Sequence, residues 1–353
     1  MKNSSLLFSC LIVVLGLLLS SCAPSASVIK SDTGSPDPVM GDWQGHIVGY
    51  TGFVEPIVLQ AIALGGDRYR FNVGSKFDTR ETGFFNNMSF EVLKAGAHFI
   101  PADSAASKEE KDAFLMVMDD GVISGKTAMK EAVSFLARKV TRLSPNLKAK
   151  PPAGAIVLFD GTSLDAWESR DVKKKGTPAA WKLTQGAMEV MPGTGDIVTK
   201  QKFTDFRLHV EFRSPFMPEA KGQARGNSGV YLQGRYEVQV LDSYGLSGED
   251  NECGGIYKVA KPRVNMCAPP MQWQSYDITF HAPRFDKDGK KIKDALLTVS
   301  HNGVSIHEDL TIPGLTGGAV DDDVKLPGGI LFQDHGNLVQ YRNIWLVELK
   351  NSR

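Results

Sequence analysis

The stretch RGNSGVYLQGRYEVQVLDSY, residues 225–244, decides the fold of the larger part of this chain. It predicts two short strands joined by a tight connection at Gly234-Arg235. Because side chains alternate between the two faces of a strand, each strand has an apolar face and a polar face. The apolar faces comprise Val230, Leu232, Tyr236, Val238 and Val240, and the polar faces comprise Asn227, Gly229, Tyr231, Gln233, Glu237, Gln239 and Leu241. A half-buried antiparallel pair is therefore expected.

The polar face carries amides, a carboxylate and an aromatic ring side by side. A sugar-binding surface needs directional partners for hydroxyl groups and a flat apolar plate for the pyranose ring. Two interpretations fit this face: a carbohydrate site, or an ordinary exposed face that is merely polar. The rest of the chain favours the carbohydrate site.

Composition places the chain among neutral all-β proteins. Its 353 residues are enough for two domains, and Lys+Arg and Asp+Glu balance at 40 each. This balance argues against nucleic acid or another anionic polymer as a partner. The 35 glycines and the regularly spaced turn signals favour short antiparallel strands.

The N-terminus predicts export and lipid anchoring. Met1-Lys2-Asn3 leads into an apolar run, residues 6–19, followed by Leu19-Ser20-Ser21-Cys22. The run is shorter than the roughly 20 residues that span a bilayer. The last four residues resemble a bacterial lipobox, so residues 1–21 are expected to be a signal peptide and Cys22 the acylated N-terminus. Residues 22–39 would tether the protein to a bacterial membrane, expected to be the outer membrane.

Two cysteines remain after export, Cys253 and Cys267. An exported chain meets an oxidising compartment, and no further metal-ligating residue lies beside either cysteine. A disulfide that closes the intervening loop and holds Tyr257 and Lys258 in place is expected.

Turn and linker signals divide the remainder. Residues 40–143 contain strand-sized segments separated by turns such as Asp119-Asp120-Gly121, and predict a small antiparallel β domain of unassigned role. Residues 144–152 are a proline-rich linker. Residues 153–351 contain longer strands, such as DFRLHVEFRS, and predict a two-sheet jelly-roll sandwich.

Several ordered motifs in this second part resemble one bacterial family. IVLFDGTSLDAW (156–167) is similar to the LFDG-x-x-L-x-x-W opening of the DUF1080 family, now called the 3-keto-disaccharide hydrolase domain. FTDFRLHVEFR, GNSGVYLQGRYEVQVLDS, CGGIY, WQSYDITFHAPR, HNGVSIHED and LPGGILFQDHGNLVQYRNIWLVEL follow in the same order, so the resemblance covers about residues 153–350. It implies a concanavalin-like jelly roll whose ligand lies on one sheet, and action on glycosides oxidised to a ketone at C3.

Such a substrate explains the polar face. A carbonyl at C3 acidifies the hydrogen on C2, so a modest base can remove it, and the enolate then expels the C1 substituent. Water adds back to give net hydrolysis, which requires a base, a donor near the C3 oxygen and an acid for the leaving group.

Glu237 is the first candidate for the base or a metal ligand. His335, in FQDHG, is expected to share a strand face with Gln333 and Leu331, and it is the candidate acid/base because histidine titrates near working pH. Each also has a structural interpretation, as a salt-bridged carboxylate and as a hydrogen-bonded histidine. The expected substrate-binding residues are Asn227, Gln239, Gln333, Arg225, Tyr257, Lys258, Asp242 and Tyr231.

His209 and Glu211, two residues apart on one strand face, are suited to share a divalent cation, although an exposed strand shows the same pattern. No other cofactor is predicted. The alternative to an enzyme is a non-catalytic glycan-binding lipoprotein, because jelly rolls also serve lectins. An endo-glucanase would need two carboxylates on one strand, which residues 237–241 do not supply.

Overall fold

The computed structural model describes residues 37–49, 52–77, 88–102, 114–127, 133–171 and 176–350. The expected signal peptide, its Cys22 and most of the tether lie outside the described residues. No described helix is long and apolar enough to cross a membrane.

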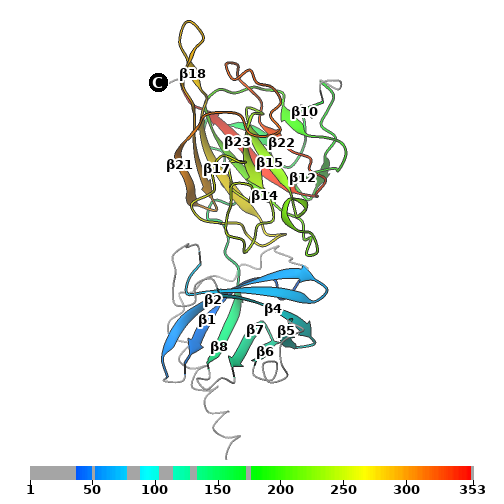
Figure 1. Cartoon of the computed structure of the whole chain (residues 1–353). Helices are drawn as coiled ribbons and strands as arrows, with labels where there is room; N and C mark the ends of the chain where they lie inside the picture. Colours follow the sequence, from blue (N-terminus) through cyan, green and yellow to red (C-terminus); the bar gives the residue numbers. More distant parts are fainter. Residues whose placement is uncertain are drawn as a thin grey trace, which may run out of the picture. The chain divides into compact units, whose positions relative to one another are not determined.

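The first part of the chain is a closed antiparallel barrel, drawn in blue to teal in Figure 1. Each strand pairs with the next, and β1 pairs with β8 to close the ring. Trp43, Phe71 and Phe99 are almost completely buried and fill its interior, as inward-facing side chains of a small barrel do. The strands are β1 Gly41–Val48, β2 Val54–Gly65, β3 Arg68–Gly74, β4 Met88–Ala95, β5 His98–Pro101, β6 Phe114–Asp119, β7 Val122–Thr127 and β8 Ser134–Val140.

The second part is a sandwich of two antiparallel sheets, drawn in green to red in Figure 1. The five-stranded sheet has the order β10-β13-β22-β15-β16, with β10 Trp167–Ser169, β13 Ile197–Thr199, β22 Leu331–Phe332, β15 Ser228–Leu232 and β16 Tyr236–Val240. The larger sheet has the order β11-β12-β23-β14-β17-β20-β21, and β9 also pairs with β23. Its strands are β9 Ile156–Phe159, β11 Lys182–Thr184, β12 Ala187–Glu189, β14 Phe206–Arg213, β17 Gln274–His281, β20 Ala295–His301, β21 Val304–Ile312 and β23 Gln340–Glu348, and a separate ribbon joins β18 Arg284–Phe285 to β19 Lys291–Lys293.

Aromatic rings fill the space between the two sheets. Phe332 of β22 stacks on Tyr341 of β23 with ring centroids 4.2 Å apart, and Trp167 stacks on Phe332 at 4.8 Å. These rings come from both sheets, so they form the shared core of the sandwich. The predicted all-β fold, a jelly-roll sandwich preceded by a small antiparallel β domain, is confirmed.

The register of β15 and β16, the two strands of the segment 225–244, confirms the predicted apolar and polar faces. Val230 pairs with Val238, and Tyr231 pairs with Glu237. The turn differs by one residue from the expected one: Gln233 and Gly234 have φ of 54° and 67°, and the Arg235 amide donates to the Leu232 carbonyl. Gln233 therefore leaves the polar face, and its amide donates to the Phe203 carbonyl.

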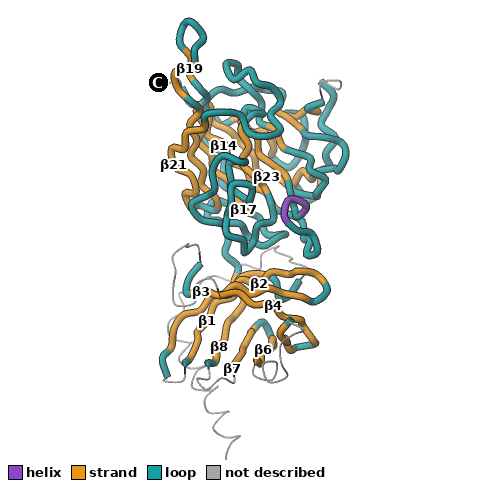
Figure 2. The backbone as a smooth tube through the Cα atoms, viewed as in Figure 1, coloured by secondary structure: helices purple, strands orange, loops and turns teal. Residues whose placement is uncertain are grey.

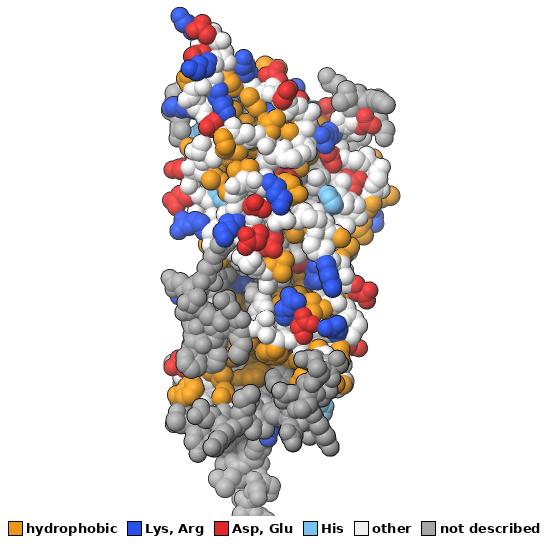
Figure 3. All heavy atoms as spheres, viewed as in Figure 1, with side chains coloured by type: hydrophobic (Ala, Val, Ile, Leu, Met, Phe, Trp, Pro, Cys, Tyr) orange, Lys and Arg blue, Asp and Glu red, His pale blue; other side chains and the backbone are white. Residues whose placement is uncertain are grey.

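Strand and loop make up nearly all of the described chain, as Figure 2 shows. The 3-10 turn Gly222–Ala224 precedes β15. On the surface seen in Figure 3, basic and acidic side chains are interspersed, in agreement with the balanced composition. No strongly single-signed patch covers that view.

Candidate functional site

The outer face of the five-stranded sheet collects the polar side chains that the sequence predicted. Tyr231 and Glu237 lie in one row across the strands, and Gln333, Gly229 and Gln239 lie in the next row. The alternating residues, Val230, Val238 and Phe332, point into the core and fix this orientation. Packing of the apolar face therefore determines which groups the outer face presents.

Glu237 has an unusual environment for a carboxylate. Its side chain is 3 % exposed, and burial raises its pKa to about 7. The negative charge of Asp196 raises the pKa further, whereas the Tyr231 hydroxyl opposes the rise. A carboxyl group that titrates near neutral pH can accept or donate a proton under ordinary conditions, as acid–base catalysis requires.

Gly229 makes room for this carboxylate. A Cβ atom at position 229 would lie 2.4 Å from Glu237 Oε1 and 2.9 Å from the Tyr231 ring. Both distances are shorter than any tolerated contact, so the absence of a side chain allows the carboxyl group to extend across β15. The glycine in this strand is therefore part of the site.

The segment 314–320 borders the site. The Tyr231 hydroxyl donates to the Gly317 carbonyl at 2.9 Å, and the Glu237 amide donates to Thr316 Oγ1 at 2.8 Å. Gln333 Nε2 lies 3.4 Å from the Tyr231 hydroxyl. Tyr231 and Gln333 thus sit beside Glu237, as the sequence predicted.

Asp196 and Arg170 belong to the same face, and sequence reasoning missed both. Arg170 Nη1 contacts Asp196 Oδ2 at 2.6 Å, and Arg170 Nη2 donates to the Gly318 carbonyl at 3.2 Å. The Asp334 amide donates to the other Asp196 oxygen at 2.8 Å. These residues lie on short strand ends far from the hairpin in sequence, and only strand order brings them to it.

Three carboxamides meet on the same face beyond Glu237. Gln239 Nε2 donates to Asn227 Oδ1 at 2.9 Å, and Asn227 Nδ2 donates to the Gln223 carbonyl at 2.7 Å. Gln239 and Asn227 are each 1 % exposed. The structure confirms that these two predicted residues lie together and adds Gln223 from the 3-10 turn.

Arg225 and Asp242 do not join this face. Arg225 Nε contacts Asp242 Oδ2 at 2.7 Å in a buried ion pair. Asp242 has the same parity as Val238 and Val240, so it continues the apolar face of β16 and its ladder. The two residues pair with each other in the protein interior. The structure therefore does not place them where substrate binding was expected.

His335 lies in an exposed loop rather than on a strand. β22 ends at Phe332, because Asp334 Oδ2 accepts the amides of Gly193 and Gly195 and turns the chain away. No hydrogen bond or ion pair joins His335 to another described residue. The expected strand through His335 is therefore wrong, and no contact couples this imidazole to Glu237.

Tyr257 and Lys258 lie beside the edge of the site. The Tyr257 amide donates to the Glu237 carbonyl at 3.3 Å, and its half-buried ring lies near Gly317. The Lys258 ammonium, which is exposed, is 3.8 Å from Asp250 Oδ1 and 5.8 Å from the Tyr257 ring. Tyr257 therefore borders the site, whereas the charge of Lys258 is directed to Asp250.

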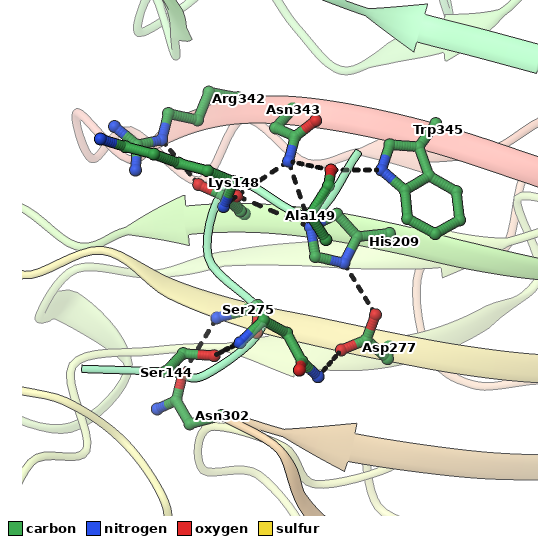
Figure 4. A network of polar contacts seen from close by, with 12 residues as sticks. Ser144, Lys148, Ala149, His209, Ser275, Asp277, Asn302, Arg342, Asn343 and Trp345 are labelled. Carbon is green, nitrogen blue, oxygen red and sulfur yellow. Dashed lines mark hydrogen bonds and ion pairs between the residues drawn. The ribbon is translucent and has the colours of Figure 1, made fainter. Parts of the chain in front are cut away.

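His209 belongs to a structural network on the other sheet, shown in Figure 4. Glu211 joins this network through hydrogen bonds from Arg342 and Asn343. Both are completely buried beneath residues 144–149. His209 Nδ1 is 2.7 Å from Asp277 Oδ1, and Glu211 accepts from Arg342 Nε at 2.7 Å and from the Lys148 amide.

These contacts determine the charge states of the network. Burial lowers the pKa of His209, but the carboxylates of Asp277 and Glu211 outweigh it and raise the pKa to about 9. Burial raises the pKa of Glu211, but hydrogen bonds from His209, Asn343 and Arg342 lower it to about 2. No set of three or more metal-ligating side chains that could hold an ion occurs among the described residues. The predicted metal site at His209 and Glu211 is therefore wrong.

Cys253 and Cys267 are free and buried, so the expected disulfide is also corrected. Cys253 Sγ lies 3.2 Å from the Tyr276 hydroxyl, and Cys267 Sγ contacts the Leu241 carbonyl at 3.4 Å. The two thiols also hydrogen-bond to each other, so they are neighbours in the core.

Comparison with known proteins identifies the family. Residues 154–347 match the model of the 3-keto-alpha-glucoside-1,2-lyase-like domain, which covers more than half of the chain. The chain therefore belongs to this family. A search of curated proteins found no match.

Solved structures provide a second comparison. A protein from Parabacteroides distasonis ATCC 8503, described as a "putative glycosyl hydrolase", is 43 % identical with a TM-score of 0.51, and the match covers 56 % of this chain and 85 % of that one. A second protein from the same organism, with the same description, is 19 % identical with a TM-score of 0.42, over 56 % and 95 % of the two chains. The match to the first structure covers about as large a share of this chain as the family match does.

Proposed function

We propose that the protein cleaves glycosides that carry a ketone at C3, with Glu237 as the base that removes the C2 proton. Membership in the 3-keto-alpha-glucoside-1,2-lyase-like family and the description of its 43 % identical neighbour support a glycoside-hydrolase-type function. The observation that carries the finer proposal is the buried Glu237, whose pKa is about 7. A base needs such a pKa to remove a weakly acidic proton near neutral pH.

The chemistry follows in two steps. Glu237 takes the C2 proton, the electron pair of that bond forms the enolate, and the C1–O bond then breaks with its electrons leaving on the aglycone oxygen. The proton that Glu237 removed passes to the aglycone oxygen, and the sugar becomes an enone. Water then adds its hydroxyl to C1 and a proton to C2, which gives the free 3-keto sugar and regenerates the protein.

The surrounding residues support this sequence. The Gln333 amide, whose Nε2 lies 3.4 Å from the Tyr231 hydroxyl, carries two N–H donors and is suited to stabilise an enolate oxygen. Asp196 keeps the Glu237 carboxyl group from becoming too acidic, and Arg170 balances the charge of Asp196. Gln239 and Asn227 are suited to bind hydroxyl groups.

The test compares a 3-keto-disaccharide with its unoxidised parent, in heavy water and with and without a chelator. We expect cleavage of the keto sugar alone, with solvent deuterium at C2 of the product, and a loss of about a thousandfold in kcat for Glu237→Gln. Glu308→Gln, an exposed carboxylate on the other sheet, is the matched control and should retain full activity. Equal cleavage of the keto sugar and its parent, or an active Glu237→Gln protein, would refute the proposal. Binding of both sugars without cleavage would indicate a glycan-binding protein instead.

A further inference from the structure

We infer that Gln239 Oε1 is a specificity-determining acceptor that reads one hydroxyl group of the sugar, in an orientation held by Asn227 and the backbone of Gln223. This inference rests on the proposed function, because it names how that site distinguishes one ring position from another. The same atom cannot bind the C3 ketone, because a carbonyl oxygen has no proton to donate. The ketone must therefore face the donors near Glu237, and a hydroxyl must face Gln239.

The orientation of each amide follows from one backbone group. The Gln223 carbonyl can only accept, so Asn227 must direct its Nδ2 at it, at 2.7 Å. Asn227 Oδ1 therefore faces Gln239. Because this oxygen can only accept, Gln239 donates to it from Nε2, at 2.9 Å. Gln239 Oε1 is left as the amide atom that does not face Asn227. If the Gln239 amide were flipped, its Oε1 would face Asn227 Oδ1. Two acceptor oxygens repel each other, so the orientation with Nε2 toward Asn227 is favoured.

Gln239 Oε1 has no hydrogen-bond partner among the described residues, although the side chain is 1 % exposed. An unsatisfied buried acceptor costs about 1–3 kcal/mol, so native proteins seldom keep one without a reason. Gln239 and Glu237 project from the same face of β16, two residues apart, which corresponds to about 7 Å along a strand. That separation lies within the width of a single pyranose ring and its substituents.

The Gln223 side chain lies beside the Gln239 amide. It is half-buried, unlike Asn227 and Gln239, and its Oε1 lies 3.5 Å from Gln239 Nε2, a weak contact. Its own Nε2 donates to the Asn251 carbonyl at 2.7 Å. The shorter contact of Asn227 Nδ2 is to the backbone carbonyl of Gln223, at 2.7 Å, and the contact to the Gln223 side-chain oxygen is longer, at 3.2 Å. Removal of the side chain therefore leaves the shorter contact in place.

Binding measured by calorimetry tests the inference without requiring turnover. The probes are methyl 3-keto-α-glucoside and its 4- and 6-deoxyfluoro analogues, in which fluorine replaces a hydroxyl and cannot donate. The protein is the full chain carrying Glu237→Gln, so that no ligand is consumed. We expect one analogue to bind about 5–20-fold more weakly than the parent sugar. Addition of Gln239→Leu should reduce this ratio to less than twofold.

The companion variants separate orientation from packing. Asn227→Leu should lower the ratio to about threefold or less, because Gln239 can then turn over. Gln223→Ala should keep the ratio and bind the parent sugar at least as tightly, because the backbone carbonyl remains. Gln201→Leu, an exposed amide in a loop, is the control and should change nothing.

Two results would overturn the inference: equal binding of all three sugars, or a ratio that survives Gln239→Leu. Failure of the proposed function gives a different result. If the keto sugars do not bind, the series is repeated with methyl α-glucoside and its fluorinated analogues. A hydroxyl-dependent ratio there would keep the role of Gln239 while removing the ketone. Absence of binding in both series would overturn the inference as well.

Discussion

Replacement of Glu237 by glutamine should make the folded protein more stable above pH 7, although it should lower kcat about a thousandfold. In the native state burial raises the pKa of this carboxyl group from its ordinary value of 4.5 to about 7. The native state therefore binds the proton more tightly than the unfolded chain does. The stability that this proton provides is fully present below about pH 4.5 and is lost as the pH rises to about 7.

The size of the effect follows from the two pKa values. Their difference, 7 minus 4.5, is 2.5, and each pH unit corresponds to about 1.4 kcal/mol, so ionisation of Glu237 destabilises the native state by about 3 kcal/mol. Glutamine has nearly the same shape and does not ionise. The free energy of unfolding of Glu237→Gln, minus that of the wild type, should be about 3 kcal/mol greater at pH 8 than at pH 4.

Urea unfolding at pH 4, 5, 6, 7 and 8, followed by tryptophan fluorescence, measures this difference. Four of the five tryptophans, at positions 167, 181, 273 and 345, lie in the sandwich, so the signal reports mainly on the domain that contains Glu237. Glu308→Gln is the control, because that side chain is exposed and should give a pH-independent difference. A difference for Glu237→Gln that stays within about 0.5 kcal/mol across this range, or falls as the pH rises, would refute the argument from burial.

Three further changes test neighbouring parts of the structure. Asp196→Asn removes the negative charge that helps to raise the pKa of Glu237, so the acid limb of the kcat/KM profile should move to lower pH; an unmoved limb would contradict that coupling. Gly229→Ala places a Cβ 2.4 Å from Glu237 Oε1, so activity should fall at least about tenfold and stability by about 1–3 kcal/mol, whereas wild-type activity would show that the carboxylate does not extend over this glycine. Glu211→Ala leaves Arg342 and His209 without their buried partner, so urea unfolding should show a loss of about 3–5 kcal/mol and trypsin should cut faster after Lys148; an unchanged cleavage rate would contradict the role of this network.

Local pattern predicted the hairpin at the centre of the site. The period-two alternation in residues 228–240 placed Glu237, Gln239 and Tyr231 on one face, and the register of β15 and β16 confirms it. The same alternation, carried two residues further, would have excluded Asp242, which has the parity of Val238 and Val240. The error at His335 has a different origin, because the capture of the Gly193 and Gly195 amides by Asp334 ends the strand early.

Other parts of the site could not be found from the chain in order. Asp196 and Arg170 reach the Glu237 face because β10 and β13 join the same sheet through β22, a neighbour more than 130 residues away in sequence. His209 and Glu211 looked like an exposed pair with metal-binding spacing, but residues 144–149 return over them and bury both. Spacing along a strand does not reveal what covers that strand.

Short-range periodicity and ordered motifs were enough to predict an all-β protein with a jelly-roll sandwich, the polar side of its central hairpin and the family of the chain. They could not predict which carboxylate is buried enough to titrate near pH 7, or which polar residues serve packing instead. The pKa of a carboxyl group depends on the water and charges around it in three dimensions, and strands distant in sequence supply those surroundings.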